Sequence, residues 1–395
     1  MHPALALALI LVAGIGITRL SRPSVRFPAL LTELAATGVV FLLFGLFLGP
    51  LLGVLDLTGL RLLQPVIALG IGWSGALFGA RLEWRMIRRV SRRTWIIGAT
   101  LAAPVLLVMT VSALTLAHAL PPLADSWGRP SLPVALVIGG ALTTAASQRG
   151  PRLGRRNALF DTTYGTAAVI VGVALYHPHA ALRAIALTLV VGSGLGGLFV
   201  WIARSGFLDD PRDAALAAFA VLLWSAGFSY AAALSPFVVC ALAAAILMSF
   251  SPLAVRRAVA GMLTRWEIPL YAAFLIVAGA LLRAMTIWVL FAAPVLALMR
   301  VLIRWITVRF GLDQVDPVWR SLPFAPPPEF AHSAIRQGAS AVALAAGFDL
   351  VRGGLGGGTG VPGAVLVTIL LSVMAAEAIA SLTPLTASPR QAEVS

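Results

Sequence analysis

The stretch at residues 94–118 reads TWIIGATLAAPVLLVMTVSALTLAH and contains no Asp, Glu, Lys or Arg. About 20 apolar residues in a helix are enough to cross a bilayer, so this stretch predicts a transmembrane helix. Across all 395 residues, 59% are hydrophobic, 11% are charged and the mean hydropathy is +0.95. Soluble domains are about 25% charged. The composition therefore excludes a cytosolic enzyme, a disordered scaffold and a secreted disulfide module, and it predicts an all-α integral membrane protein that is not an enzyme.

The positive charge of the chain comes from arginine alone. The net charge is +14, all 29 basic residues are Arg, and Lys is absent. In a soluble chain this balance would indicate nucleic-acid binding, but here the arginines cluster between apolar runs, as in the cytoplasmic loops of membrane proteins. The absence of Lys also excludes a Walker-type phosphate loop. The single Cys240 fits a small core residue.

Thirteen apolar segments are candidate transmembrane helices. We interpret the first as a retained helix because it lacks the basic n-region and the cleavage site of a signal peptide. The connections are short and residues 309–333 read as a linker, which predicts one transmembrane domain over residues 1–395 and no soluble domain. The segments are 3–20, 28–49, 62–80, 94–118, 132–148, 157–176, 180–203, 212–233, 235–251, 266–282, 285–308, 334–350 and 362–384.

The arginines alternate between connections that carry several of them and connections that carry one or none. Cytoplasmic loops hold the excess of Arg, so this pattern predicts an N-terminus outside and a C-terminus in the cytoplasm of a bacterial inner membrane. An odd number of helices also suits two inverted repeats, at about 1–178 and 211–385, joined by a linker helix at 180–203.

Ionisable residues inside predicted spans are the strongest candidates for function, because a charge at the bilayer centre costs about 2.5–3.5 kcal/mol. Asp161 lies inside the sixth span, and Arg300 and Arg304 share one face of the eleventh. For these three, a role in an ion path and a snorkelling role remain open. Residues near span ends are expected to be solvated or to snorkel to the membrane surface. This second group consists of Glu33, Glu267 and Asp349, and Glu377 is a further candidate inside the last span.

Two predicted spans contain unusual runs of small and hydroxyl residues. The fifth span ends with Thr143, Thr144 and Ser147, and the twelfth begins with Gln337 followed by Gly338, Ala339 and Ser340. Interrupted helices at the membrane midplane offer free carbonyl groups to ions, although close helix packing explains small residues equally well. The GxGxxG match at 192–197 lies within an apolar helix, where helix packing is the better interpretation. No motif for a cofactor or a resident metal ion is found, and we predict none.

Four stretches resemble the membrane domain of the monovalent cation:proton antiporters, a family that includes bacterial sodium/proton exchangers and potassium-efflux systems. They are FGLFLGP at 44–50, GALFGARLE at 75–83, PLYAAFLIVAGA at 269–280 and the Gln337-Gly338 pair. The resemblance implies thirteen helices, two crossed discontinuous helices (the fifth and twelfth), and a core that moves against a dimer-forming domain. It also implies a cation- and proton-binding acid at Asp161 and a basic partner at Arg304.

The chain departs from the family at the site itself. Asp161 is followed by Thr162, where the family has a second acid or an Asn-Asp pair. We predict a homodimeric antiporter that exchanges Na+ or K+ for H+. Asp161 would alternate between the two ions, Thr143, Thr144, Ser147 and Thr162 would supply neutral oxygens, and Arg304 and Arg300 would supply the counter-charge. A non-transporting structural or regulatory homologue and an organic-anion transporter remain as alternatives.

Overall fold

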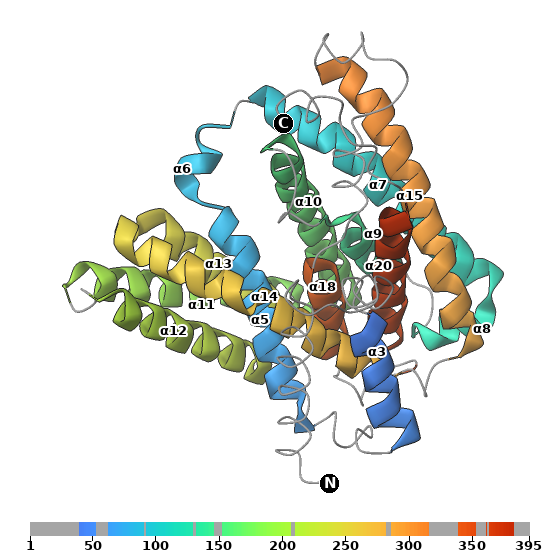
Figure 1. Ribbon diagram of the computed structural model, residues 1–395, viewed down its shortest axis with the longest axis horizontal. Helices are drawn as coiled ribbons and strands as arrows, with labels where there is room; N and C mark the ends of the chain where they lie inside the picture. The colour runs from blue at the N-terminus through green and yellow to red at the C-terminus, as the bar shows by residue number, and fades with distance from the viewer. Residues whose placement is uncertain are drawn as a thin grey trace, which may run out of the picture.

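The computed structural model describes residues 39–52, 62–90, 92–128, 132–145, 152–206, 210–281, 286–315, 339–352, 361 and 363–382. Within these ranges every regular element is helical (Figure 1). In chain order the elements are α3 (Val39–Leu46) with the π-helical turn η1 (Phe47–Leu51), α5 (Gln64–Arg81), α6 (Trp84–Ile87), α7 (Arg92–Ala119), α8 (Pro121–Ser126), α9 (Leu132–Thr143), α10 (Arg152–Tyr176), α11 (Pro178–Arg204), α12 (Pro211–Ala231), α13 (Pro236–Phe250), α14 (Leu253–Leu281), α15 (Ile287–Val315), α18 (Ala339–Val351) and α20 (Ala364–Leu382).

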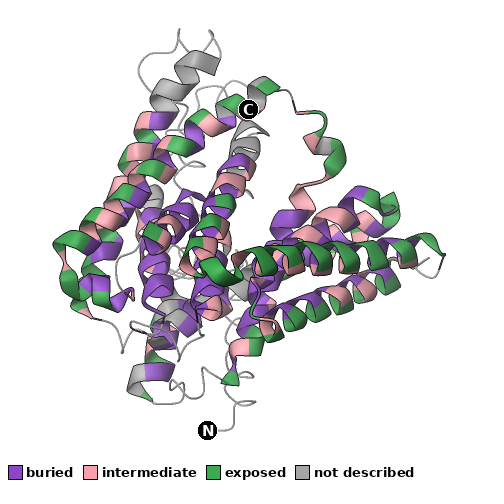
Figure 2. Cartoon of the chain, turned by 180° about the vertical axis from the view of Figure 1, so that it is seen from behind, coloured by how far each residue is buried: buried purple, intermediate pink, exposed green. Residues whose placement is uncertain are grey.

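The described part of the chain has the apolar surface of a membrane protein. Five of its helices are long and apolar enough to cross a bilayer, namely α7, α10, α11, α12 and α15. Large apolar side chains are exposed on their outer faces, such as Leu182 at 82% and Leu107 at 64%, while buried residues gather inside the bundle (Figure 2). Contiguous apolar surface of this kind suits lipid. The chain is an all-α, multi-pass membrane protein, and the count of thirteen helices remains a prediction.

Proline marks the start of several helices, as its fixed φ and missing N–H group favour. Proline occupies the first turn of α5, α8, α11, α12 and α13, and the Asp210 side chain caps α12 by accepting from the Arg212 backbone N–H at 2.7 Å. Four predicted boundaries are wrong by more than a turn, namely the end of α9, the starts of α10 and α14, and the end of α15. The largest difference is at the start of α14. The tenth span was expected at 266–282, but α14 already begins at Leu253, because a hydropathy window stops at charged residues whereas a helix continues past the membrane into water.

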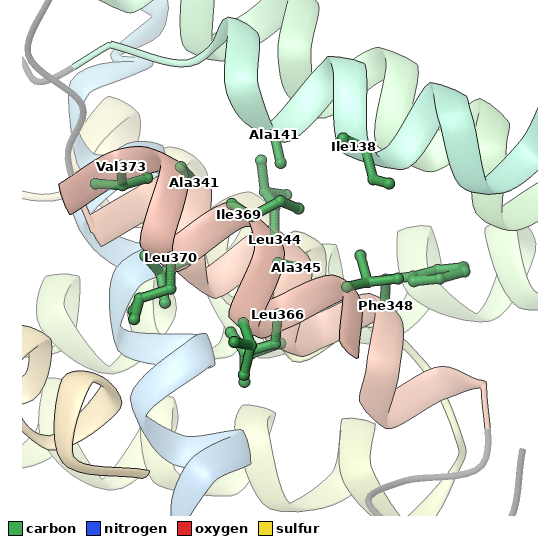
Figure 3. Close-up of a cluster of buried hydrophobic side chains, with 14 of the residues drawn as sticks. Ile138, Ala141, Ala341, Leu344, Ala345, Phe348, Leu366, Ile369, Leu370 and Val373 are labelled. Atoms are coloured by element: carbon green, nitrogen blue, oxygen red, sulfur yellow. The ribbon is translucent and has the colours of Figure 1, made fainter. Parts of the chain in front are cut away.

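Two clusters of buried side chains hold the bundle together. One lies between α5, α11, α12, α13 and the start of α14. The other joins α7, α8, α9, α15, α18 and α20, with further side chains from α3, α5, α13 and α14. In the second cluster, Ile138 and Ala141 of α9 face Leu344 and Phe348 of α18, with α20 alongside (Figure 3). The two short apolar helices α9 and α18 therefore meet at the centre of this cluster.

The small-residue stretch at 192–197 packs within its own chain. A Cβ atom added at Gly192 or Gly196 would lie about 3 Å or less from atoms of α13, whereas Gly194 and Gly197 have no such neighbour within 4 Å. The helix-packing interpretation of this motif is therefore correct for Gly192 and Gly196. Their face of α11 packs against α13 inside the protomer.

Candidate ion-binding site

Asp161 lies in α10, 3% exposed, beside the C-terminal end of α9. The two helices touch where glycine faces glycine. A Cβ atom on Gly140 would lie 2.6 Å from the carbonyl oxygen of Gly165, and one on Gly165 would lie 2.4 Å from that of Gly140. Gly165 is one helical turn beyond Asp161, so this backbone contact brings the carboxylate close to the last residues of α9.

Arg300 and Arg304 of α15 point at the same end of α9. Arg300 is completely buried and donates from Nε to the carbonyl oxygen of Leu142 at 2.7 Å and from Nη2 to that of Thr144 at 3.1 Å. Arg304, 2% exposed, donates from Nη2 to the carbonyl oxygen of Thr143 at 2.6 Å. The last carbonyls of a helix lack partners within the helix. The two guanidinium groups therefore cap α9 with side chains that come from more than 150 residues away in the chain.

Arg304 also forms an ion pair with Asp161. Its Nη1 lies 2.9 Å from the carboxylate Oδ2, and both side chains are buried. The other carboxylate oxygen, Oδ1, is buried and has no hydrogen-bond partner among the described residues. A buried polar atom without a partner is costly, so Oδ1 marks a position where a proton or a cation would be stabilised.

Three threonines surround the pair with neutral oxygens. The hydroxyl groups of Thr143 and Thr144 donate to the carbonyl oxygens of Gly139 and Ala141 at 2.7 and 2.8 Å. The hydroxyl of Thr162 reaches from α10 to the carbonyl oxygen of Ala145 at 3.5 Å. These hydroxyl groups bond backbone carbonyls near the point where α9 ends at Thr143, five residues before the predicted end of that span. A hydroxyl that donates one hydrogen bond also carries acceptor lone pairs, which are ligands of the kind that a cation binds.

The charges of the described site do not cancel. Arg300 and Arg304 together carry two positive charges, because arginine stays protonated in proteins, whereas ionised Asp161 carries one negative charge. The carbonyl end of a helix carries roughly half a negative charge, which favours cations there. The end of α9 therefore offsets much of the second arginine, and Asp161 is the titratable member of this cluster.

Among the described residues, six of the predicted site residues lie together in the structure: Asp161, Thr162, Thr143, Thr144, Arg304 and Arg300. Ser147, Gln337 and Glu33 lie outside the described residues, as do the side chains of Glu267 and Glu377. One expectation is wrong: Asp349 was expected to be solvated near a helix end but is 3% exposed. Among the described residues, no cluster of three His, Cys, Asp or Glu side chains could hold a metal ion.

Asp349 belongs to a second buried ionic cluster that sequence reasoning missed. Its Oδ2 accepts from the backbone N–H of Leu366 at 3.1 Å, and its Oδ1 lies 3.6 Å from Nη2 of Arg352. Arg352 donates to the carbonyl oxygen of Trp127 at 2.6 Å, and the Trp127 indole N–H donates to the Thr368 hydroxyl at 3.0 Å. The cluster links the end of α18 to the start of α20 and to the end of α8. Its members look like ordinary loop and helix-end residues in the sequence.

Comparison with known proteins identifies the architecture. No family model and no curated protein matches the sequence. Among solved structures, the fold is similar to that of the sodium proton antiporter MjNhaP1 from Methanocaldococcus jannaschii at pH 8, with a TM-score of 0.61 and 15% sequence identity over 96% of this chain and 94% of that one. The chain is therefore similar, over nearly its whole length, to the fold of a sodium proton antiporter.

Proposed function

We propose that this protein is a secondary antiporter that exchanges Na+ or K+ for H+, with Asp161 binding the two ions in turn. The observation that supports this most is the state of its carboxylate. Asp161 is buried, one oxygen is paired with Arg304, and the other has no hydrogen-bond partner among the described residues. A carboxylate inside a membrane protein must be neutralised, paired or occupied, and these three states form an exchange cycle.

In this cycle the proton, the cation and Arg304 compete for one carboxylate. When Asp161 is ionised and no cation is present, Arg304 neutralises it, as in the structure. A cation would bind at Oδ1, which has no partner among the described residues, and compete with the guanidinium group for the charge of Asp161, while Arg304 keeps its bond to the carbonyl oxygen of Thr143. Thr143, Thr144 and Thr162 then supply neutral oxygens, with Ser147 as a further donor. Because one carboxylate cannot hold a proton and a cation together, the two ions move in alternate steps.

A single titratable group at the site also sets the stoichiometry that we propose. Arg304 cannot release its proton, so it cannot carry a second one as a lysine could. Asp161 would then exchange one proton for one monovalent cation. This exchange moves no net charge, so its rate should not respond to an imposed membrane potential.

We propose that the chain forms two inverted repeats at about 1–178 and 211–385, joined by a helix at 180–203, and that it assembles as a homodimer in a bacterial inner membrane. The repeats are supported by α9 and α18, two short apolar helices in corresponding positions that pack on each other. Exposed apolar side chains along α11, such as Val190 at 67%, are available for a partner subunit or for lipid.

The test is ion-driven proton movement in proteoliposomes that contain the purified protein and a trapped pH-sensitive dye. Wild-type protein should dissipate a preformed pH gradient when Na+, K+ or Li+ is added. The cation that causes dissipation is then identified as the substrate. Asp161→Asn keeps the size and polarity of the side chain but removes its charge. We expect this variant to fold, with a normal gel-filtration profile, and to lose cation-dependent proton movement.

The matched control is Asp213→Asn, because Asp213 is an exposed acid on α12, away from the site. This variant should exchange ions at the wild-type rate. Wild-type exchange by Asp161→Asn would end the assignment of Asp161 as the ion carrier, and Glu377 would be the next residue to test.

A second candidate, a non-transporting homologue with a structural or regulatory role, is favoured by one observation. The carbonyl oxygens of Leu142, Thr143 and Thr144 and one oxygen of Asp161, which a cation would use, all contact arginine side chains. The arginines would then act as tethered cations that fill the site permanently. Wild-type proteoliposomes that show no exchange with Na+, K+ or Li+ would support this candidate.

The same contacts weigh against the organic-anion alternative. That reading requires Arg300 and Arg304 to present their guanidinium groups to a substrate. In the structure both groups donate to acceptors of the protein itself, so an anion would have to break these bonds before it gained its own.

A further inference from the structure

The segment between α5 and α7 combines a high density of arginine with an exposed surface. Residues 81–93 contain six arginines and one acid, Glu83. Arg85, Arg88 and Arg89 are exposed, and we call these three the arginine platform. The adjoining Trp84 is 53% exposed, although large aromatic side chains are usually covered unless they lie at an interface. Figure 1 shows the short helix α6 at the edge of the bundle, where the chain passes from α5 to α7.

The platform is held in place by contacts that leave its arginines without an ion-pair partner among the described residues. Glu83 forms an ion pair with Arg256 of α14, so the one acid of the segment is already engaged. The backbone N–H of Trp84 donates to the hydroxyl of Ser249 at 2.8 Å, which fixes the start of α6 against α13. These two bonds orient the segment, and the arginine platform faces outward as a fixed cluster of positive charge.

A shallow apolar pocket lies directly behind the platform, where α5, α6, α7 and α10 meet. Ile87 and Val90 line it from the platform side, and Trp95 and Phe160 line it from α7 and α10, with their rings in edge-to-face contact at 4.8 Å. The remaining lining residues are Arg81, Leu82, Leu159 and Thr163. The same short segment thus presents arginine outward and apolar side chains inward.

We propose that this segment is a binding site for an anionic phospholipid. The headgroup phosphate would lie on the arginine platform, and the part of one acyl chain nearest the glycerol would lie in the pocket beside Phe160. Basic clusters next to a membrane attract anionic lipid headgroups, at about 1 kcal/mol per arginine, or about fivefold in affinity. Free phosphate would use the arginines alone, whereas a lipid also uses the apolar pocket and the exposed Trp84. The proposal does not depend on ion exchange.

The experiment is a titration of the purified full-length protein in detergent with dioleoyl phosphatidylglycerol, followed by native mass spectrometry. The test variant changes Arg85→Gln, Arg88→Gln and Arg89→Gln together. Loss of three charges should weaken lipid binding about a hundredfold. The matched control changes three other exposed arginines, Arg212→Gln, Arg257→Gln and Arg265→Gln, and should bind the lipid within a fewfold of wild type.

Two further arms separate a lipid site from simple charge attraction. Val90→Trp fills the pocket without changing the charge and should also lower the affinity for the lipid. The unfolding temperature of this variant, measured in parallel, verifies that it folds. Inorganic phosphate at millimolar concentration should not displace the lipid, and dioleoyl phosphatidylcholine should bind far more weakly. Equal losses in the two arginine triples, unchanged binding by the platform triple, or displacement by inorganic phosphate would each overturn the proposal.

Discussion

At the scale of single residues, the site depends on the permanent positive charge of Arg304. Arg304 contacts both the Asp161 carboxylate and the backbone of α9, with 2.9 Å to Oδ2 and 2.6 Å to the carbonyl oxygen of Thr143. Because arginine remains protonated, the only way to release Asp161 is to move the guanidinium group or to protonate the acid. Each exchange cycle would therefore weaken this pair, either by protonation of Asp161 or by movement of Arg304.

The first prediction concerns the stability of this pair. Removing one partner of a buried ion pair leaves the other charge uncompensated, which costs about 3–5 kcal/mol. Arg304→Ala should therefore lower the free energy of unfolding by about that amount, and Arg304→Lys should cost less because the charge remains. The measurement is thermal or denaturant-induced unfolding of the purified protein in detergent.

A double substitution checks the origin of this loss. Asp161→Asn combined with Arg304→Ala removes both charges, and replacement of a whole buried pair by neutral groups is often tolerated. The double variant should be more stable than Arg304→Ala. Strictly additive losses would mean that the two side chains do not depend on each other.

Sequence reasoning singled out both members of the buried ion pair, Asp161 and Arg304, and also Arg300, but not all of their partners. Charge within an apolar span identified Asp161, Arg300 and Arg304, and the resemblance paired the first with the last. The contacts of Arg300 with the carbonyl oxygens of Leu142 and Thr144 could not be foreseen, because they depend on where α9 ends in space. Arg352 read as a loop residue for the same reason: its acceptor, Trp127, is 225 residues away in the chain.

At the scale of elements, α9 is held at both ends by arginines from the second half of the chain. Arg352 donates to the carbonyl oxygen of Trp127, shortly before α9 begins, and Arg300 and Arg304 bind its last carbonyls. Between these ends, α9 packs on α7, α10 and α18. A helix fixed in this way keeps its C-terminal end beside Asp161.

The second prediction tests the glycine contact that places Asp161 beside α9. A Cβ atom at position 140 would meet the carbonyl oxygen of Gly165 at 2.6 Å, and backbone cannot yield as a flexible side chain can. Gly140→Ala should lower the free energy of unfolding by about 1–3 kcal/mol. The matched control is Gly194→Ala in α11, which meets no atom within 4 Å and replaces a poor helix former with a good one. A loss of stability in the control equal to that of Gly140→Ala would contradict the packing argument.

Helix positions followed from hydropathy where the helix and the membrane end together. The predicted spans at 94–118, 180–203 and 212–233 agree with α7, α11 and α12 to within two residues at each end. The prediction failed where polar residues continue a helix, as Arg256 and Arg257 do in α14, and where hydroxyl groups end one early, as in α9. Hydropathy reports contact with lipid and not the hydrogen bonds that set a helix end.

At the scale of the whole molecule, the fold similarity to a sodium proton antiporter covers nearly the entire chain, and no sequence comparison with family models or curated proteins reveals it. Fold class was predictable because composition alone requires transmembrane helices. The packing of α9 on α18 at the centre of one buried cluster was implied only by the family resemblance, since it depends on contacts between residues far apart in the sequence.

The third prediction concerns the orientation of the molecule in the membrane. Asp125 on α8 and Arg88 after α6 are both exposed, and the arginine pattern assigns them to opposite sides. A membrane-impermeant maleimide should label Asp125→Cys in intact cells, and Arg88→Cys only after permeabilisation. The native Cys240 is buried and should give little background. The reverse labelling pattern would invert the proposed topology.

The ion pair at the site also has a consequence for how the chain is made. Asp161 and Arg304 are 143 residues apart, and at about 5–20 residues per second the ribosome needs roughly 7–30 s to travel that distance. Throughout this interval α10 is already synthesised while its partner on α15 does not exist, so the acid meets the insertion machinery alone. Chains that terminate before α15 keep that unpaired acid, and we expect membrane proteases to recognise it as a feature of an unfinished molecule.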